Sequence, residues 1–222
     1  MSETFNGFGL NIVALSENDE KLAAWEREQE KYKEQAKLDA YRKSGVPEKF
    51  YNSSFDTYIA ETEEEKRIKA QVMDFAKSDK CGTLLMCGAN GNGKTLLGCS
   101  VIRESGGEYL TSTAMCVKYE AAIGYKAEMT RDALLEHWCK LKGVFVIDEI
   151  GKYFINPDLE KFLVSTVTCG RYENGRKSVL IGNPKKKPFV EFLGKAVYDR
   201  FTESCTAIEF NGESKRKGLR NV

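Results

Sequence analysis

The chain has 222 residues, 41% of them hydrophobic, and its 34 basic and 33 acidic side chains leave a net charge of +1. That length allows one domain with a short extension and a sizeable core. No run approaches the roughly 20 apolar residues of a membrane span, and the first residues lack the basic-then-apolar layout of a signal peptide. We therefore expect a cytoplasmic protein with no membrane partner.

The N-terminal region predicts a long helix. From Ser16 to about Lys43 it is rich in Glu, Lys, Gln and Ala, has no Gly or Pro, and opens on a capping-box-like Ser16-x-x-Asp19. Its thin apolar stripe includes Trp25 and Tyr32, which is compatible with a solvated arm as well as with a helix that docks on a partner. Gly45 and Pro47 end the helix. We expect an extension at 1–46 and a main domain at 47–222.

The main domain begins with a helical stretch near Glu63–Ser78, after which strands and helices alternate. This alternation predicts an α/β fold with a central five-stranded parallel sheet flanked by helices. The expected strands are Thr83–Cys87, Glu108–Thr111, Val144–Asp148, Ser178–Gly182 and Thr206–Phe210. The expected helices between them are Thr95–Glu104, Ala114–Lys126, Arg131–Leu141, Pro157–Tyr172 and Pro188–Glu203.

The first chemical motif is a P-loop, the pattern G-x-x-x-x-G-K-[ST]. An apolar strand runs into it and a helix follows, which is the setting that the motif requires. Its backbone N–H groups and the helix N-terminus would hold the phosphates of ATP, Lys94 would reach the β- and γ-phosphates, and the Thr95 hydroxyl would bind Mg²⁺. The residues expected to bind nucleotide are Gly88, Ala89, Asn90, Gly91, Asn92, Gly93, Lys94, Thr95 and Leu96.

The second motif is an apolar strand that ends in two carboxylates, Asp148 and Glu149. This is the Walker B arrangement, in which Asp148 would stand beside Mg²⁺ and Glu149 would polarise the attacking water. Downstream of a P-loop, the double acid favours an ATPase over a small kinase. A third strand runs into Asn183, which is either a sensor of the γ-phosphate or the polar start of a turn before Pro184.

With these elements in order, the chain resembles the AAA+ ATPases of the DnaC/IstB group, which are helicase loaders and transposition helpers. The resemblance runs from Gly45 to the C-terminus. It rests on the P-loop, on Val146-Ile147-Asp148-Glu149-Ile150-Gly151, on Arg171-Tyr172, on Asn183, and on the lead-in Gly45-Val46-Pro47-Glu48-Lys49-Phe50-Tyr51-x-x-Ser54-Phe55. It also includes Leu193-Gly194 through Asp199-Arg200 and the closing Gly212-Glu213-Ser214-Lys215-Arg216.

The resemblance implies further roles. It makes Arg200 an arginine finger that acts on a neighbouring subunit, and hence implies a head-to-tail oligomer. Arg216 would sense the nucleotide, although too little sequence follows Phe210 for a full C-terminal lid. Where relatives often have Ser-Asn, this chain has Gly182-Asn183 and then three lysines at 185–187, which would contact DNA phosphates or form a solvated loop.

The expected function is therefore that of a DnaC-like helicase loader. Such a protein binds a replicative DNA helicase through its N-terminal segment and delivers it to single-stranded DNA under control of ATP and Mg²⁺. Two alternatives stay open: an IstB-like helper of a DNA transposase, and an oligomeric scaffold that binds ATP with negligible hydrolysis.

Overall fold

The computed structural model describes residues 7–123, 128–183, 186–194, 205–212 and 214–215. The chain divides into two compact units, Met1–Ala40 and Tyr41–Val222. The second unit starts before residue 47 because Tyr41, Ser44 and Val46 are already buried in it. In the described part of the chain, no helix is both long and apolar enough to cross a membrane.

The first unit is helical. Helix α1 spans Gly7–Arg42, so the expected start at Ser16 was wrong. Ser16 lies inside the helix, because the residues before it (Leu10 to Leu15) favour helix well enough to continue the hydrogen-bond ladder. Trp25 and Tyr32 are exposed, at 58% and 74% of their surface.

The second unit is an α/β domain whose five strands are all parallel and lie in the order β2-β3-β4-β1-β5. The five-stranded parallel sheet expected from the sequence is thus confirmed. Its elements are η1 (Glu48–Phe50), α2 (Glu63–Lys77), β1 (Gly82–Gly88), α3 (Lys94–Ser105), β2 (Gly107–Thr111), α4 (Ser112–Ala121), α5 (Arg131–Lys140), β3 (Val144–Ile150), α6 (Pro157–Glu173), β4 (Lys177–Gly182), α7 (Lys186–Leu193) and β5 (Cys205–Phe210).

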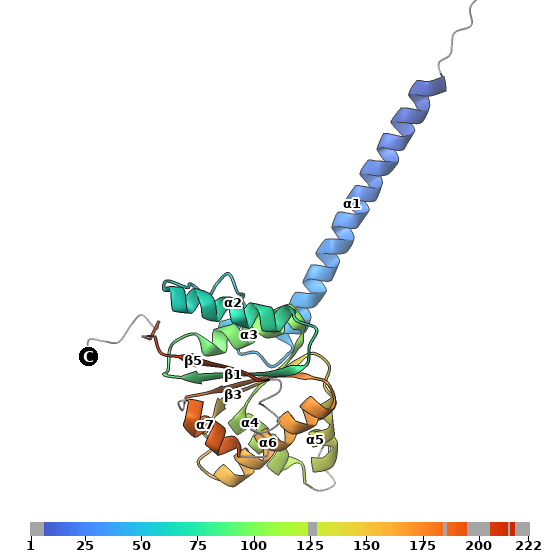
Figure 1. Ribbon diagram of the computed structural model, residues 1–222. Helices are drawn as coiled ribbons and strands as arrows, with labels where there is room; N and C mark the ends of the chain where they lie inside the picture. The colour runs from blue at the N-terminus through green and yellow to red at the C-terminus, as the bar shows by residue number, and fades with distance from the viewer. Residues whose placement is uncertain (1–6, 124–127, 184–185, 195–204, 213, 216–222) are drawn as a thin grey trace, which may run out of the picture. The chain divides into compact units, whose positions relative to one another are not determined.

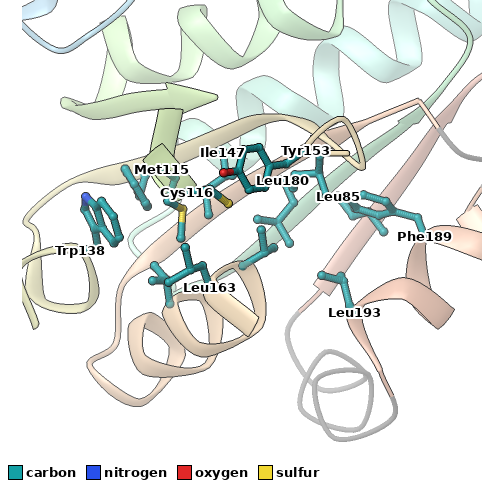
Figure 2. Packing of buried hydrophobic residues seen from close by; sticks show 14 residues of the cluster. Leu85, Met115, Cys116, Trp138, Ile147, Tyr153, Leu163, Leu180, Phe189 and Leu193 are labelled. Atoms are coloured by element: carbon teal, nitrogen blue, oxygen red, sulfur yellow. The ribbon is translucent and has the colours of Figure 1, made fainter. Parts of the chain in front are cut away.

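Helices cover both faces of this sheet, with α2 and α3 on one side and α4 to α7 on the other (Figure 1). Coverage of both faces explains why β1 is buried along its whole length and reads as a continuous apolar run. A core cluster joins the sheet to the helices of the second side, and Trp138, Leu163 and Phe189 are among its buried members (Figure 2).

Two expected helices were too long. Helix α4 ends at Ala121 rather than Lys126, because Ala122 leaves helical geometry and its N–H donates to the Tyr119 carbonyl, closing a tighter turn. Helix α7 ends at Leu193, because Gly194 follows with a φ of 86°, which terminates a helix. The rest of the expected helix, 195–203, lies outside the described residues. Among the described residues no helix follows β5.

Candidate nucleotide-binding site

A cavity of about 590 Å³ lies at the carboxyl ends of the strands, where open parallel sheets bind their ligands. It collects residues that are far apart in the sequence. The expected site residues that line it are Asn90, Gly91, Gly93, Lys94, Thr95, Leu96, Asp148, Glu149 and Asn183.

The P-loop joins the end of β1 to the start of α3. Gly93 precedes α3 with a φ of 85°, a left-handed conformation that strains other residues, and a Cβ there would lie 2.6 Å from the Tyr58 ring. As at any helix N-terminus, the first-turn N–H groups of α3 lack acceptors within the helix, and such N–H groups can bind a phosphate. Lys94 is 6% exposed, and its Nζ donates to the carbonyls of Gly88 at 2.9 Å and Ala89 at 2.5 Å.

Three expected P-loop residues do not line the cavity. Asn92 is buried, and its amide Nδ2 donates to the carbonyls of Phe210 at 3.3 Å and Gly212 at 2.7 Å, so its side chain ties the loop to the end of β5. A Cβ at Gly88 would lie 2.4 Å from the Phe210 carbonyl oxygen, so this glycine is required for packing against β5. Ala89 is exposed, with its carbonyl bound by Lys94.

Asp148, on β3, is 3% exposed and accepts three hydrogen bonds. Its Oδ2 accepts from the Thr95 hydroxyl at 2.7 Å and the Tyr109 hydroxyl at 2.9 Å, and its Oδ1 accepts from the Glu149 N–H at 2.6 Å. Burial raises the pKa of Asp148, while these hydrogen bonds oppose the shift. The hard oxygen atoms of Asp148 and Thr95 fit Mg²⁺, which would also offset the cost of burying the carboxylate.

Glu149 differs from Asp148 in its exposure and in its backbone conformation. It is exposed, and among the described residues it is the one non-glycine with a positive φ, at 60°. The register between β3 and β4 shifts between Ile147 and Ile150, so Glu149 leaves the regular strand alternation. Its Oε1 pairs with Lys152 Nζ at 2.9 Å. Such strain at a strand end is typical of a functional position.

Asn183 follows β4 directly and is partly buried. Because β4 lies between β1 and β3, its carboxyl end opens between the P-loop and Asp148. A polar amide in this place could contact a γ-phosphate or the water that attacks it.

Comparisons with known proteins found relatives by sequence and by fold. No family model matches the sequence. The sequence is 24% identical to the replicative helicase loader DnaC of Buchnera aphidicola subsp. Baizongia pistaciae, over 91% of this chain and 88% of that protein. The fold matches the crystal structure of the DnaC helicase loader with a TM-score of 0.61 at 16% identity, covering 74% of this chain and 100% of that one.

The chain is therefore similar to DnaC helicase loaders in sequence and in fold. Its fold also matches DnaA from Aquifex aeolicus bound to AMPPCP, with a TM-score of 0.55 at 12% identity, over 74% of this chain and 50% of that one. The resemblance to DnaC-type helicase loaders expected from the ordered motifs is therefore confirmed.

Two residues expected in the site, Arg200 and Arg216, lie outside the described residues, as does Lys185 of the basic run. The residue next to Arg216, Lys215, does line the cavity. Its Nζ pairs with Glu65 Oε1 at 2.8 Å and lies 4.8 Å from the centre of the Tyr58 ring.

Sequence reasoning missed Tyr58, Tyr109, Lys152 and Lys215, which all line the cavity. Burial, together with the charge of Asp148, raises the pKa of Tyr109, so its hydroxyl stays protonated and donates. Thr111 pairs with Asp148 between β2 and β3. Tyr109 lies two residues before Thr111 on the same face of the sheet, so this register places Tyr109 near the carboxylate. That signal exists only once the strand order is known.

Proposed function

We propose that the chain is an ATP-dependent helicase loader that engages a replicative DNA helicase and places it on single-stranded DNA. The observation that carries this proposal is the extent of the match to the Buchnera DnaC. The second unit makes up 182 of the 222 residues, so a match over 91% of the chain must extend into the first unit. The likeness thus includes part of the helical extension as well as the nucleotide-binding core.

The P-loop and β3 would hold the substrate. Lys94 would exchange its bonds to the Gly88 and Ala89 carbonyls for phosphate oxygens, and the N-terminus of α3 would face the same phosphates. Thr95 and Asp148 would hold Mg²⁺, which supplies neutralising charge to the β- and γ-phosphates. The 2.7 Å bond between these two side chains supports the assignment.

Glu149 would orient the attacking water and accept its proton. For this, its carboxylate must leave Lys152, a half-exposed partner whose attraction is weak enough to exchange. Asn183 would hold the water or the γ-phosphate. Arg200 would stabilise the transition-state charge in a neighbouring subunit, and Arg216 would contact the nucleotide of its own subunit. A trans-acting arginine requires a head-to-tail oligomer.

The N-terminal unit would supply client specificity. Trp25 and Tyr32 are large aromatic side chains left exposed on α1, and such residues often anchor protein interfaces. The expected client is a replicative helicase, and the expected nucleic acid is single-stranded DNA.

The first test is ATP turnover measured over a series of protein concentrations, with single-stranded DNA, duplex DNA or neither. We expect turnover that rises with protein concentration and with single strands. Lys94→Ala should abolish ATP binding, whereas Glu149→Gln should keep binding and lose turnover. Arg200→Ala should bind ATP normally yet lose the concentration-dependent turnover, and Arg67→Ala, which removes an exposed arginine on α2, serves as its control.

Other outcomes would support the alternatives. Stimulation by duplex DNA alone would favour a transposition helper, and ATP binding without turnover above the Glu149→Gln blank would favour a scaffold. Unchanged ATP affinity in Lys94→Ala would contradict the site itself. Failure to co-purify with the replicative helicase of the same cell, with and without ATP, would contradict the loader role.

A further inference from the structure

Tyr109 is a buried residue of β2 whose hydroxyl reaches the metal-binding end of β3. It is 5% exposed, and β2 is an edge strand of the sheet. Since Thr111 lies opposite Asp148 in the ladder, Tyr109 stands diagonally across from the carboxylate on the same face. Its long side chain spans this diagonal and donates to Asp148 Oδ2 at 2.9 Å.

This hydrogen bond restricts how Asp148 can turn. A carboxylate offers about four acceptor positions, and three of them are filled by donors from separate elements. These donors are the Thr95 hydroxyl on α3, the Tyr109 hydroxyl on β2 and the Glu149 N–H on β3. Thr95 is itself an expected ligand of Mg²⁺, so Tyr109 is the side-chain donor that can hold the carboxylate independently of the metal.

The backbone of Tyr109 is bound on its other side by the segment that leaves α1. On the outer edge of β2, the Tyr109 N–H donates to the Ser44 carbonyl at 2.8 Å. A Cβ at Gly45, where φ is 84°, would lie 2.5 Å from the Tyr109 carbonyl oxygen. Ser44 in turn donates through both its N–H, at 3.1 Å, and its hydroxyl, at 2.7 Å, to the Tyr41 carbonyl. The junction 41–45 therefore rests directly on the residue that orients Asp148.

We propose that Tyr109 is a positioning residue that orients Asp148 for Mg²⁺, and that it couples the seating of residues 41–45 to metal affinity. The inference rests on the proposed nucleotide site and adds a means of regulating it. A partner that pulls on α1 and unseats the junction would shift β2 at Tyr109 and weaken the metal-dependent part of ATP binding. Partners that orient a metal ligand typically change metal affinity by about 10- to 100-fold when removed.

The direct test is Tyr109→Phe, with ATP binding followed by calorimetry over a series of Mg²⁺ concentrations. The ring still fills its place and Thr95 still donates to Oδ2, so the fold should survive. We expect the Mg²⁺ concentration at half-maximal binding to rise roughly 10-fold, with ATP affinity in EDTA unchanged. A purely structural role would lower the Tm and weaken binding in EDTA and Mg²⁺ alike, and that result would overturn the proposal.

The matched control is Tyr153→Phe. It removes another buried tyrosine's hydrogen bond to a carboxylate, the 2.6 Å contact with Glu120 Oε2, which is not among the cavity-lining residues. It should leave the Mg²⁺ dependence unchanged. An equal shift in Tyr153→Phe and Tyr109→Phe would overturn the specific role of Tyr109.

The coupling is tested with Gly45→Ala against Gly175→Ala. Both positions have a positive φ, but a Cβ at Gly175 meets nothing within 4 Å. Both variants should lose stability, whereas only Gly45→Ala should also raise the Mg²⁺ requirement. If Gly45→Ala does not fold, Tyr41→Phe loosens the same junction by removing the 2.7 Å bond to the Phe50 carbonyl. An unchanged Mg²⁺ dependence in a folded junction variant would overturn the coupling.

Different results would contradict the proposed function and the role of Tyr109. If the wild-type chain shows no Mg²⁺-dependent ATP binding, the proposed function is wrong. If the wild-type chain binds MgATP and Tyr109→Phe binds it with the same Mg²⁺ dependence, only the role of Tyr109 is wrong.

Discussion

At the scale of single residues, Glu149 combines a strained backbone with a chemical role. A left-handed conformation costs a non-glycine residue about 1–2 kcal/mol, and part of that cost is recovered when glycine replaces it. The Lys152 contact is half-exposed and offsets little of the strain. We therefore expect Glu149→Gly to raise the free energy of unfolding of the nucleotide-free protein by roughly 0.5–1 kcal/mol and to abolish ATP turnover.

Urea unfolding of the two variants separates strain from side-chain chemistry. Glu149→Gln keeps the Cβ and hence the strain, so it should lose turnover without gaining stability. Equal stability of Glu149→Gly and Glu149→Gln would show that the backbone at this position is not strained.

At the scale of elements, Arg171 on α6 joins three neighbouring segments at the amino end of the sheet. It is fully buried, and its guanidinium donates to the carbonyls of Trp138, Leu141, Gly143 and Lys177. Burial lowers its pKa to about 10. Because Arg171→Met would remove the donor from these buried and partly buried carbonyls, we expect a loss of about 3–5 kcal/mol in the free energy of unfolding, measured in urea.

Lys140→Ala is the control for Arg171. It removes a cation from an exposed pair with Glu136 and should leave the free energy of unfolding nearly unchanged. A loss of similar size in both variants would contradict the structural role of Arg171.

The stability contributed by the contact between Glu65 and Lys215 should depend on pH. Desolvation opposes ionisation of Glu65, but hydrogen bonds from Lys215 and from the N–H groups of Glu61 and Thr62 outweigh it, so the pKa of Glu65 is lowered. A lowered folded-state pKa contributes stability above the unfolded value, near 4.5, and that stability is lost as pH falls through the folded value. We expect Glu65→Gln to cost about 1 kcal/mol at pH 7 and progressively less below pH 4.5.

Thermal unfolding between pH 3 and pH 7 checks this expectation, with Glu63→Gln as the control. Glu63 pairs with Lys66 in the first turn of the same helix, but that pair is exposed and should contribute little. A cost for Glu65→Gln that stays constant down to the acid end would contradict the ionic contribution of Glu65.

At the scale of the whole molecule, the division after Ala40 predicts two separable roles. Between Lys21 and Ala40, where side chains are described, no side chain is buried. Removal of residues 1–40 should therefore leave the Tm and the ATP affinity of the remaining chain nearly unchanged, while binding to the helicase is lost. Calorimetry and co-purification measure the two effects, and an unfolded truncated chain would contradict the separation.

The sequence alone determined the fold class and predicted nine of the residues that line the candidate nucleotide site. Strand and helix periodicity, the P-loop at 88–95 and the acidic pair Asp148-Glu149 in β3 are all local patterns, and such patterns reflect backbone geometry directly. Helix ends were predicted less accurately: the capping-box-like pattern at Ser16 lies inside α1, and the stop at Gly194 was not used to end α7. Local signals for a helix end compete with the helix propensity of the residues on either side.

The tertiary structure decided which partners these residues meet. That Asn92 faces β5 while Asp148 receives a hydroxyl from Tyr109 follows from the order β2-β3-β4-β1-β5, which brings together strands distant in the sequence. The sequence identified the residues expected to carry the chemistry because local sequence patterns specify local backbone conformation. Their orientation and coupling arise from long-range packing, whose register no local pattern specifies.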